Sequence, residues 1–257
     1  MTFDPRPAAK LLAEAWRSGN AIDTLADGIR PGNVHEGYDI QDLFMAEIAQ
    51  PIVGWKLGLG SAPQKVQTGV GRAIAGRILG SHLFKHGDAI PVPKDGAAVI
   101  EFEIGFILGR DIRPDEGAFP VMDAVSEVCV TYEIVFSRFK DRIAAGFPSF
   151  AADNGAFHAL VMGPRVEPVR LGFVAQTLSV AANGEAMAGA IIGDLATDPT
   201  ASFADLIAVA KERGMVLPKG SIISTGTLSK PFTVSGAETV LRAQFMGQEL
   251  ACTLKAG

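Results

Sequence analysis

The chain has 257 residues, of which 48% are hydrophobic and 20% are charged. This balance is typical of a globular protein and argues against disorder, and the length suits one large domain or a core with a small appendage. The net charge of −5, the isoelectric point near 5.4 and the scattered lysines and arginines give no support to a nucleic-acid-binding surface.

The cellular setting is predicted from cysteines and from hydropathy. Cys129 and Cys252 lie in apolar, strand-like surroundings, which favours buried thiols in a reducing compartment over a disulfide framework. The N-terminal residues lack the basic-then-apolar order of a signal peptide, and no apolar stretch reaches membrane-spanning length. We therefore expect a cytoplasmic protein without membrane or nucleic-acid partners.

The first part of the chain is predicted to be helical. Asp4 and Pro5 indicate a helix start, with Asp4 as N-cap and Pro5 at the first helical position, and Gly19 ends the apolar helical pattern. A second apolar stripe predicts another helix before residue 51. These patterns predict an N-terminal helical arm over residues 1–51, ahead of a main body over residues 52–257.

Strand patterns dominate the main body and do not alternate regularly with helices. A helix is predicted over residues 201–213, with Gly214 as its stop, and Asn183 with Gly184 predicts a hairpin turn. The mixture indicates an α+β fold with a curled sheet rather than a doubly wound one. The predicted strands cover residues 53–57, 74–79, 98–108, 128–136, 159–162, 172–182, 222–226, 239–245 and 249–254.

Three glutamates interrupt these apolar strands, Glu101 and Glu103 in one and Glu133 in another. Residues two apart on a strand share a face, so Glu101 and Glu103 project side by side. Neighbouring like charges raise each other's pKa or require a cation, and a third carboxylate completes the outline of a Mg²⁺ or Mn²⁺ site. The alternative is a half-exposed strand whose glutamates meet water. The apolar run continuing over residues 105–108 favours a strand covered on both faces, and with it the metal site.

Other polar residues are candidates for substrate contact, each with a structural alternative. Lys56, inside an apolar strand, could anchor an anion or act as an acid or base, or could be a surface lysine. Asp153 and Asn154 could present polar groups to a pocket or form only a turn. The strand end over residues 223–227 offers hydroxyl and backbone N–H groups to a carboxylate, or is only a capped strand end.

A dinucleotide-binding loop is not supported. Residues 54–61 contain several glycines after a short strand, but the third glycine of that motif is missing. We also expect Pro63 to break the helix that should follow such a loop.

Taken in order, these segments resemble the hydratase/decarboxylase branch of the fumarylacetoacetate hydrolase superfamily, which includes 2-keto-4-pentenoate hydratase and 4-oxalocrotonate decarboxylase. The resemblance spans nearly the whole chain and is most specific in the Glu-x-Glu strand with its following Gly-Arg-Asp and in the later Glu-Ile-Val-x-Ser-Arg segment. The matching segments are residues 37–41, 54–58, 100–111, 133–138, 152–154 and 222–227.

The resemblance implies a mixed β-roll with flanking helices, assembled into dimers or larger rings. It implies Mg²⁺ or Mn²⁺ held by Glu101, Glu103 and Glu133, and a 2-oxo acid that chelates this ion. Lys56 would hold the substrate or move a proton.

The same resemblance gives Asp153 a catalytic role and Asn154 a role in substrate binding. Substrate binding is also expected at the late strand end, at Thr225, Gly226 and Thr227.

Two departures from the family leave the substrate and the reaction open. Gly155 and Ala156 stand where family hydratases commonly have a serine, and residues 193–195 are Gly-Asp-Leu where Gly-His-Pro is common.

Two reactions are compatible with a metal-bound 2-oxo acid. We expect hydration of a 2-hydroxypenta-2,4-dienoate-type substrate first, and decarboxylation of a 4-oxalocrotonate-type substrate second. A third expectation is an accessory subunit that binds 2-oxo acids, within a complex of a hydratase and a decarboxylase. The histidine and glutamate dyad of C–C bond hydrolases in the superfamily has no recognisable counterpart, which disfavours hydrolysis.

Overall fold

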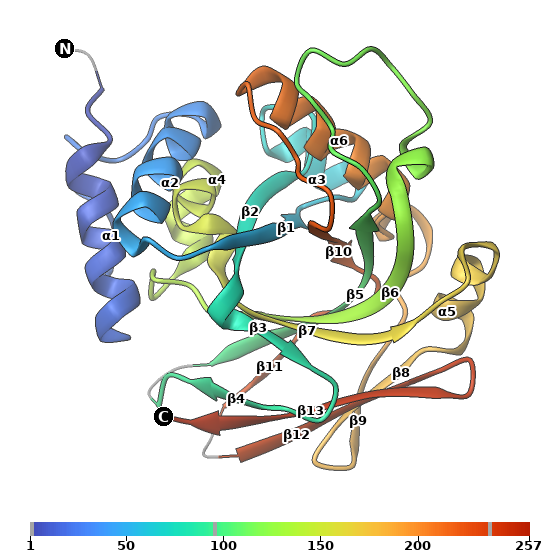
Figure 1. The fold of residues 1–257 in the computed structure, drawn as a ribbon. Helices are drawn as coiled ribbons and strands as arrows, with labels where there is room; N and C mark the ends of the chain where they lie inside the picture. The colour runs from blue at the N-terminus through green and yellow to red at the C-terminus, as the bar shows by residue number, and fades with distance from the viewer. Residues whose placement is uncertain (1–2, 95–96, 236–237) are drawn as a thin grey trace.

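Two β-sheets form the body of the chain in the computed structural model, which describes residues 3–94, 97–235 and 238–257 (Figure 1). The larger sheet has the order β2-β1-β10-β5-β6-β7-β3, with β11 added to β5, and it curls until β2 approaches β7. Its strands are β1 (Ile52–Gly58), β2 (Ile74–Leu79), β3 (Leu83–Lys85), β5 (Ala98–Leu108), β6 (Val125–Val135), β7 (Phe157–Arg165), β10 (Ile222–Thr227) and β11 (Phe232–Val234). The expected α+β roll is confirmed.

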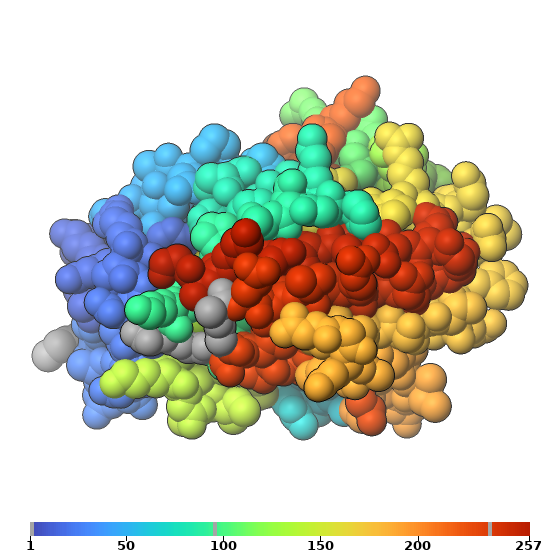
Figure 2. Space-filling view, turned by 90° about the horizontal axis from the view of Figure 1, so that it is seen from below, coloured from blue at the N-terminus to red at the C-terminus, as the bar shows by residue number. Residues whose placement is uncertain are grey.

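The smaller sheet lies below the larger one in Figure 1 and has the order β4-β13-β12-β8-β9. Figure 2 shows its C-terminal strands, in red, crossing the lower face of the molecule. The Asn183–Gly184 turn joins β8 to β9 with positive φ at both residues, as a tight hairpin requires. The strands are β4 (Ala89–Val92), β8 (Ser179–Ala182), β9 (Glu185–Gly189), β12 (Glu238–Phe245) and β13 (Gln248–Ala256).

The main core lies between the two sheets. Phe102 of β5 packs edge-on against Tyr132 of β6, with ring centroids 5.7 Å apart, and lies 5.5 Å from the ring of Phe245 in β12. Side chains alternate between the two faces of a strand, so the residues on either side of Phe102 project to the opposite, concave side of the larger sheet. Those residues are Glu101 and Glu103.

The N-terminal helices α1 (Arg6–Ser18) and α2 (Val34–Ile48) pack side by side against this body. Leu12 of α1 and Phe44 of α2 share an apolar cluster with Ile78 of β2, which fastens both helices to the larger sheet. Helix α1 begins one residue later than predicted, with Pro5 at the N-cap position. The division into an arm and a body stays a prediction.

Three further local predictions differ from the structure. Residues 171–177 form α5 (Leu171–Thr177), so the strand predicted over residues 172–182 exists only from Ser179, as β8. Pro63 does not break a helix; it lies in the first turn of α3 (Ala62–Gln67), where a missing N–H costs nothing. Helix α6 (Pro199–Glu212) begins two residues before the predicted start, after the Asp198 N-cap.

Helix α4 (Arg142–Ala152), like α3, was not predicted from the sequence. It contains Pro148 and is interrupted at Gly146, which has φ of 81° and ψ of 166°. Both residues disfavour a regular helix, so the sequence pattern does not predict one here. Short 3₁₀ turns are Gly80–His82, Val121–Ala124, Asn154–Ala156, Pro168–Arg170 and Gly193–Leu195.

Among the described residues, none of the helices combines the length and the apolar character needed to span a lipid bilayer.

Candidate metal centre

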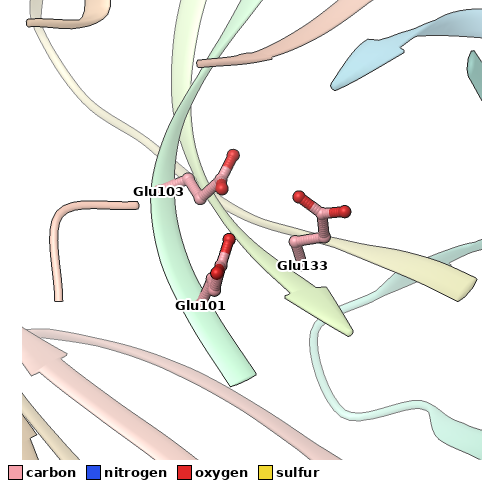
Figure 3. A group of neighbouring side chains, drawn as sticks. All are labelled: Glu101, Glu103 and Glu133. Atoms are coloured by element: carbon pink, nitrogen blue, oxygen red, sulfur yellow. The ribbon is translucent and has the colours of Figure 1, made fainter. Parts of the chain in front are cut away.

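The three glutamates meet on the concave side of the larger sheet. Strands β5 and β6 are antiparallel and place Glu101 directly opposite Glu133, while Glu103 lies two residues further along β5 on the same face. Figure 3 shows the three carboxylates pointing toward one another, and one oxygen from each lies within 4.8 Å of the others. The strand register thus brings together the three residues proposed as metal ligands.

Burial distinguishes these carboxylates from surface groups. Glu103 and Glu133 are 0% exposed, so the alternative of a solvated strand face is wrong for both, whereas Glu101 is partly exposed. Burial, followed by the charges of Glu133 and Glu101, raises the pKa of Glu103 well above its ordinary value of 4.5. Burial also raises the pKa of Glu133 to about 7, although Lys56 acts in the opposite direction.

Strand β10 holds one oxygen of Glu103. The Ser224 hydroxyl donates to Glu103 Oε2 at 2.6 Å, and the Gly226 N–H donates to the same oxygen at 3.0 Å. Gly226 has φ of 99° at a register shift between β10 and β5, and a side chain there would meet the carbonyl oxygen of Leu57 at 3.1 Å. Thr131 Oγ1 lies 2.7 Å from Ser224 Oγ and completes this support.

Lys56 supplies the cation nearest to the glutamates. Its side chain is 2% exposed, and Nζ lies 2.8 Å from Glu133 Oε1. The ammonium also lies 5.4 Å from the centre of the Phe150 ring. The structure therefore excludes a surface position for Lys56.

The donor set fits a hard divalent cation. Glu103 Oε1 and Glu133 Oε2 are buried and have no hydrogen-bond partner within the described part of the chain. One lysine faces three carboxylates whose oxygens lie close enough to one another to hold a single ion. Buried carboxylate oxygens without donors are costly, and clusters of oxygen ligands suit Mg²⁺ or Mn²⁺.

A cavity of about 280 Å³ adjoins the glutamates. Lys56 and Glu101 line it, together with Thr227 of β10 and Gly155. Phe147 and Phe150 of α4 give it an apolar wall, and Arg142 also faces it. The cavity offers a small organic acid both polar and apolar surfaces beside the carboxylates.

Asp153 and Asn154 are not among the residues that line this cavity. Asp153 is fully buried and forms an ion pair with Arg138. The Asn154 side chain accepts from the Arg77 N–H at 2.6 Å and donates to the Arg77 carbonyl at 2.9 Å, so it is committed to the β2 backbone. Their predicted roles at the substrate remain predictions.

The three residues predicted to bind substrate at the end of β10 do not all face the cavity. The Thr225 hydroxyl donates to the Ile104 carbonyl at 2.9 Å and points away from the cavity, while Gly226 and Thr227 line it. Gly226 uses its N–H to hold Glu103, and the Thr227 hydroxyl donates to the Ser229 carbonyl at 2.8 Å. The Gly226 N–H, which was expected to bind a substrate carboxylate, binds the carboxylate of Glu103 instead.

Sequence reasoning included Ser224 within residues 223–227 without foreseeing its contact with Glu103, and it missed the cavity residues of α4. Strand periodicity places Ser224 and Gly226 on one face and Thr225 on the other, so this signal could have identified Ser224. Arg142 and Phe147 gave no comparable signal, because the helix that contains them is irregular.

Comparison with known proteins places this geometry in a family. The family model for the fumarylacetoacetate (FAA) hydrolase C-terminal region matches residues 79–255, which include all three glutamates. The 2-keto-4-pentenoate hydratase of Paraburkholderia xenovorans (strain LB400) is 30% identical over 227 residues, covering 86% of this chain and 84% of that protein. A 4-oxalocrotonate decarboxylase of Pseudomonas sp. is 28% identical over 225 residues, covering 85% of each.

A solved structure shows the same fold over nearly the whole length. The 4-oxalocrotonate decarboxylase from Pseudomonas putida G7, complexed with magnesium and adipate, has a TM-score of 0.82 and 21% sequence identity and covers 97% of both chains. The sequence match across residues 79–255 and the 30% identity of the hydratase agree with the triad and the curled sheet. The chain belongs to the fumarylacetoacetate hydrolase family.

Proposed function

We propose that this protein is a divalent-metal-dependent lyase that hydrates a 2-hydroxypenta-2,4-dienoate-type substrate to a 4-hydroxy-2-oxo acid. The observation that supports this most directly is the set of buried carboxylate oxygens without partners, beside a buried lysine and a cavity. The names of the relatives, hydratases at 25–30% identity and a decarboxylase at 28%, favour the same substrate class.

Glu101, Glu103 and Glu133 would hold Mg²⁺ or Mn²⁺. When bound, such an ion supplies Lewis acidity at the 2-oxo oxygen and stabilises negative charge there. Ser224 and the Gly226 N–H fix the carboxylate of Glu103 in advance, so one ligand is held in place by the protein itself.

Lys56 is the group best placed to move a proton. Lys56 lines the cavity, and its Nζ contacts Glu133 Oε1 at 2.8 Å. An ammonium at this position can donate a proton to the far carbon of the dienol while the enol hydroxyl gives up its proton to water, which yields an unsaturated ketone. Water then adds to this ketone, with its hydroxyl at C4 and its proton at C3. The aromatic wall from Phe147 and Phe150 would exclude other water from the carbon chain.

Decarboxylation of a 4-oxalocrotonate-type 2-oxo acid is the second candidate. The same site would stabilise the electron pair that stays on the substrate when CO₂ departs, and a relative at 28% identity bears the name of that activity. A 2-oxo-acid-binding accessory subunit is the third candidate, because Gly155 and Ala156 replace a serine common in the family hydratases. Homo-oligomer formation and a complex of hydratase and decarboxylase also stay predictions.

The test uses the purified full-length chain with Mg²⁺, 2-hydroxypenta-2,4-dienoate and, separately, 2-oxohex-3-enedioate. Hydration of the first supports the proposal. Release of CO₂ from the second, with no water added to either, favours the decarboxylase. Metal-dependent binding without turnover of either favours the accessory subunit. Glu103→Gln is the matched variant, since it keeps the size of a ligand and removes its charge; full activity with this variant would show that the site is misassigned.

A further inference from the structure

Thr197 places a hydroxyl without a partner on the wall of the cavity beside the glutamates. The residue is 7% exposed and lines this cavity. Within residues 3–94, 97–235 and 238–257 its hydroxyl makes no hydrogen bond, and unlike the hydroxyl of nearby Ser202 it is not fully enclosed by protein. Buried polar atoms usually have a partner, so an unsatisfied hydroxyl on a cavity wall is suited to a ligand.

The position of Thr197 is set by a helix cap and by two glycines. Asp198 caps α6, and its carboxylate accepts from two backbone N–H groups of the first turn, at 2.8 and 3.1 Å, which fixes the chain directly after Thr197. The Thr197 side chain lies between Gly60 and Gly226, where an added Cβ would come 3.0 and 3.1 Å from Thr197 Cγ2. The two glycines therefore leave the space that this side chain occupies.

The same contact places the hydroxyl beside the proposed metal ligands. A Cβ at Gly226 would lie 3.6 Å from Thr197 Oγ1, and the Gly226 N–H donates to Glu103 Oε2 at 3.0 Å. Gly226 therefore separates the Thr197 hydroxyl from the carboxylate of Glu103 by a single residue's backbone. The hydroxyl lies at the part of the cavity where Glu103 is held.

The substrate of the proposed function has its oxygen atoms at one end. A 2-hydroxypenta-2,4-dienoate has a carboxylate and the 2-oxygen at that end and hydrocarbon at the other. Donors for this carboxylate were expected at residues 225–227, but the Thr225 and Thr227 hydroxyls donate to backbone carbonyls and the Gly226 N–H donates to Glu103. The hydroxyl of Thr197 is uncommitted, and a hydrogen bond to a charged acceptor is stronger than one between neutral groups.

We propose that the Thr197 hydroxyl donates a hydrogen bond to the carboxylate of the 2-oxo acid at the metal centre, in the role expected of residues 225–227. This inference rests on the proposed function and deepens it by assigning a substrate-binding residue to the same site. It applies to hydration and to decarboxylation, because both substrates have a 2-oxo acid end. Thr197 takes no part in proton transfer.

The experiment measures binding of 2-oxopentanoate, a monocarboxylic 2-oxo acid with no carbon–carbon double bond to hydrate, to the full chain with Mg²⁺ by isothermal titration calorimetry. Thr197→Val replaces the hydroxyl by a methyl group of similar size and should weaken binding by about 10- to 100-fold. Thr197→Ser keeps the hydroxyl and should change binding by less than about threefold. Thr239→Val is the matched control, because Thr239 of β12 is 6% exposed and does not line this cavity, so binding should be unchanged.

A titration with Mg²⁺ alone separates a substrate contact from a disturbance of Glu103. Because Thr197 packs beside Gly226, a purely structural effect of Thr197→Val would loosen the support of Glu103 and weaken Mg²⁺ itself. We expect the Kd of Mg²⁺ for the ligand-free variant to stay within about threefold of the wild-type value. A loss of Mg²⁺ affinity as large as the loss of 2-oxopentanoate affinity would overturn the proposed contact.

Kinetics gives a second readout on a substrate that the wild type turns over. Thr197→Val should raise KM, with kcat changed by less than about threefold, as expected when an interaction present in both the ground state and the transition state is removed. A fall in kcat with unchanged binding of 2-oxopentanoate would overturn the assignment to the carboxylate.

The outcomes also distinguish this inference from the proposed function. Equal, Mg²⁺-dependent binding of 2-oxopentanoate by the wild type and Thr197→Val would overturn the role of Thr197 and leave the proposed function standing. Failure of the wild type to bind this ligand in a Mg²⁺-dependent way would overturn both.

Discussion

Two buried carboxylate–cation pairs in this chain differ in how many of their polar atoms have partners. In the first, Asp153 forms an ion pair with Arg138 and accepts from the Ser137 hydroxyl at 2.7 Å. The Arg138 guanidinium also donates to the carbonyl oxygens of Phe136 at 2.8 Å and Phe157 at 2.6 Å. The protein itself satisfies this pair.

The second pair is incomplete. Glu133 contacts Lys56 through Oε1 at 2.8 Å, while its Oε2 and the Oε1 of neighbouring Glu103 have no partner among the described residues. Buried polar atoms in folded proteins nearly always find partners, so a complete pair is explained by the fold and an incomplete one requires a ligand. The comparison therefore distinguishes an ion pair that the protein itself satisfies from one that leaves carboxylate oxygens free for a ligand.

The largest effect is expected from breaking the complete pair. Asp153→Asn leaves the Arg138 guanidinium buried without a counter-charge and should lower the free energy of unfolding by about 3–5 kcal/mol, measured by urea denaturation. Asp23→Asn is the control, because Asp23 pairs with Lys140 at the surface and should lose less than about 1 kcal/mol. Similar small losses for both variants would contradict the structural role of Asp153.

Metal addition should stabilise the incomplete pair. At a Mg²⁺ concentration about 100 times its Kd, the free energy of unfolding of the wild-type chain should rise by about 2.7 kcal/mol. Glu103→Gln removes a charged ligand and should abolish most of this rise, whereas Asp153→Asn should retain it in full. Thermal and urea unfolding with and without Mg²⁺ measure this rise. An equal rise in Glu103→Gln and in the wild type would show that the cation binds elsewhere.

Without metal, Glu103→Gln should raise the free energy of unfolding instead of lowering it. The pKa of Glu103 is raised above 4.5, so the folded chain holds a proton that the unfolded chain releases, and stability falls as the pH rises above about 4.5. Glu103→Gln should therefore stabilise the metal-free protein by about 1–2 kcal/mol at pH 8 and by less at pH 5. Urea denaturation in a chelator at both pH values measures this difference. Equal stability of variant and wild type at pH 8 would show that the buried charge of Glu103 does not destabilise the metal-free protein.

The shared face of the three proposed metal ligands could be predicted from the sequence because it depends on local periodicity. The long apolar runs predict β5 and β6, and the spacing of Glu101 and Glu103 places them on one face. Alternation alone could not decide whether that face meets water. The answer depends on the pairing of distant strands in the larger sheet, where β10 lies beside β5 and places Ser224, 121 residues further along the chain, next to Glu103.

The rest of the site depends on residues whose positions no local pattern specifies. Helix α4 contains Gly146 and Pro148, so no periodic signal indicates that Arg142 lies on a helix beside the cavity. The Asp153 carboxylate is predicted near a substrate, but its partner is Arg138, 15 residues earlier and on the other side of α4 in the sequence. The apolar residues of 171–177 suit a strand or a helix over so short a length, which explains the wrong strand prediction there.

A substitution at Gly155 tests whether the position of Lys56 against Glu133 matters. It has φ of 61°, and a Cβ there would lie 2.8 Å from Lys56 Cε and 3.0 Å from Nζ. Gly155→Ala should cost roughly 1–2 kcal/mol of stability from the left-handed backbone alone, and Gly214→Ala should cost about the same, because Gly214 has φ of 65° with no atom within 4 Å.

The two glycine variants should differ in catalysis. In Gly155→Ala the added methyl group displaces the buried Lys56 ammonium from Glu133, and a displacement of about 1 Å at a reacting group can lower kcat/KM by about 100-fold. Gly214→Ala leaves Lys56 in place and should keep the wild-type kcat/KM. If the two variants are equally active on a substrate that the wild type turns over, the position of Lys56 against Glu133 is not what the reaction requires.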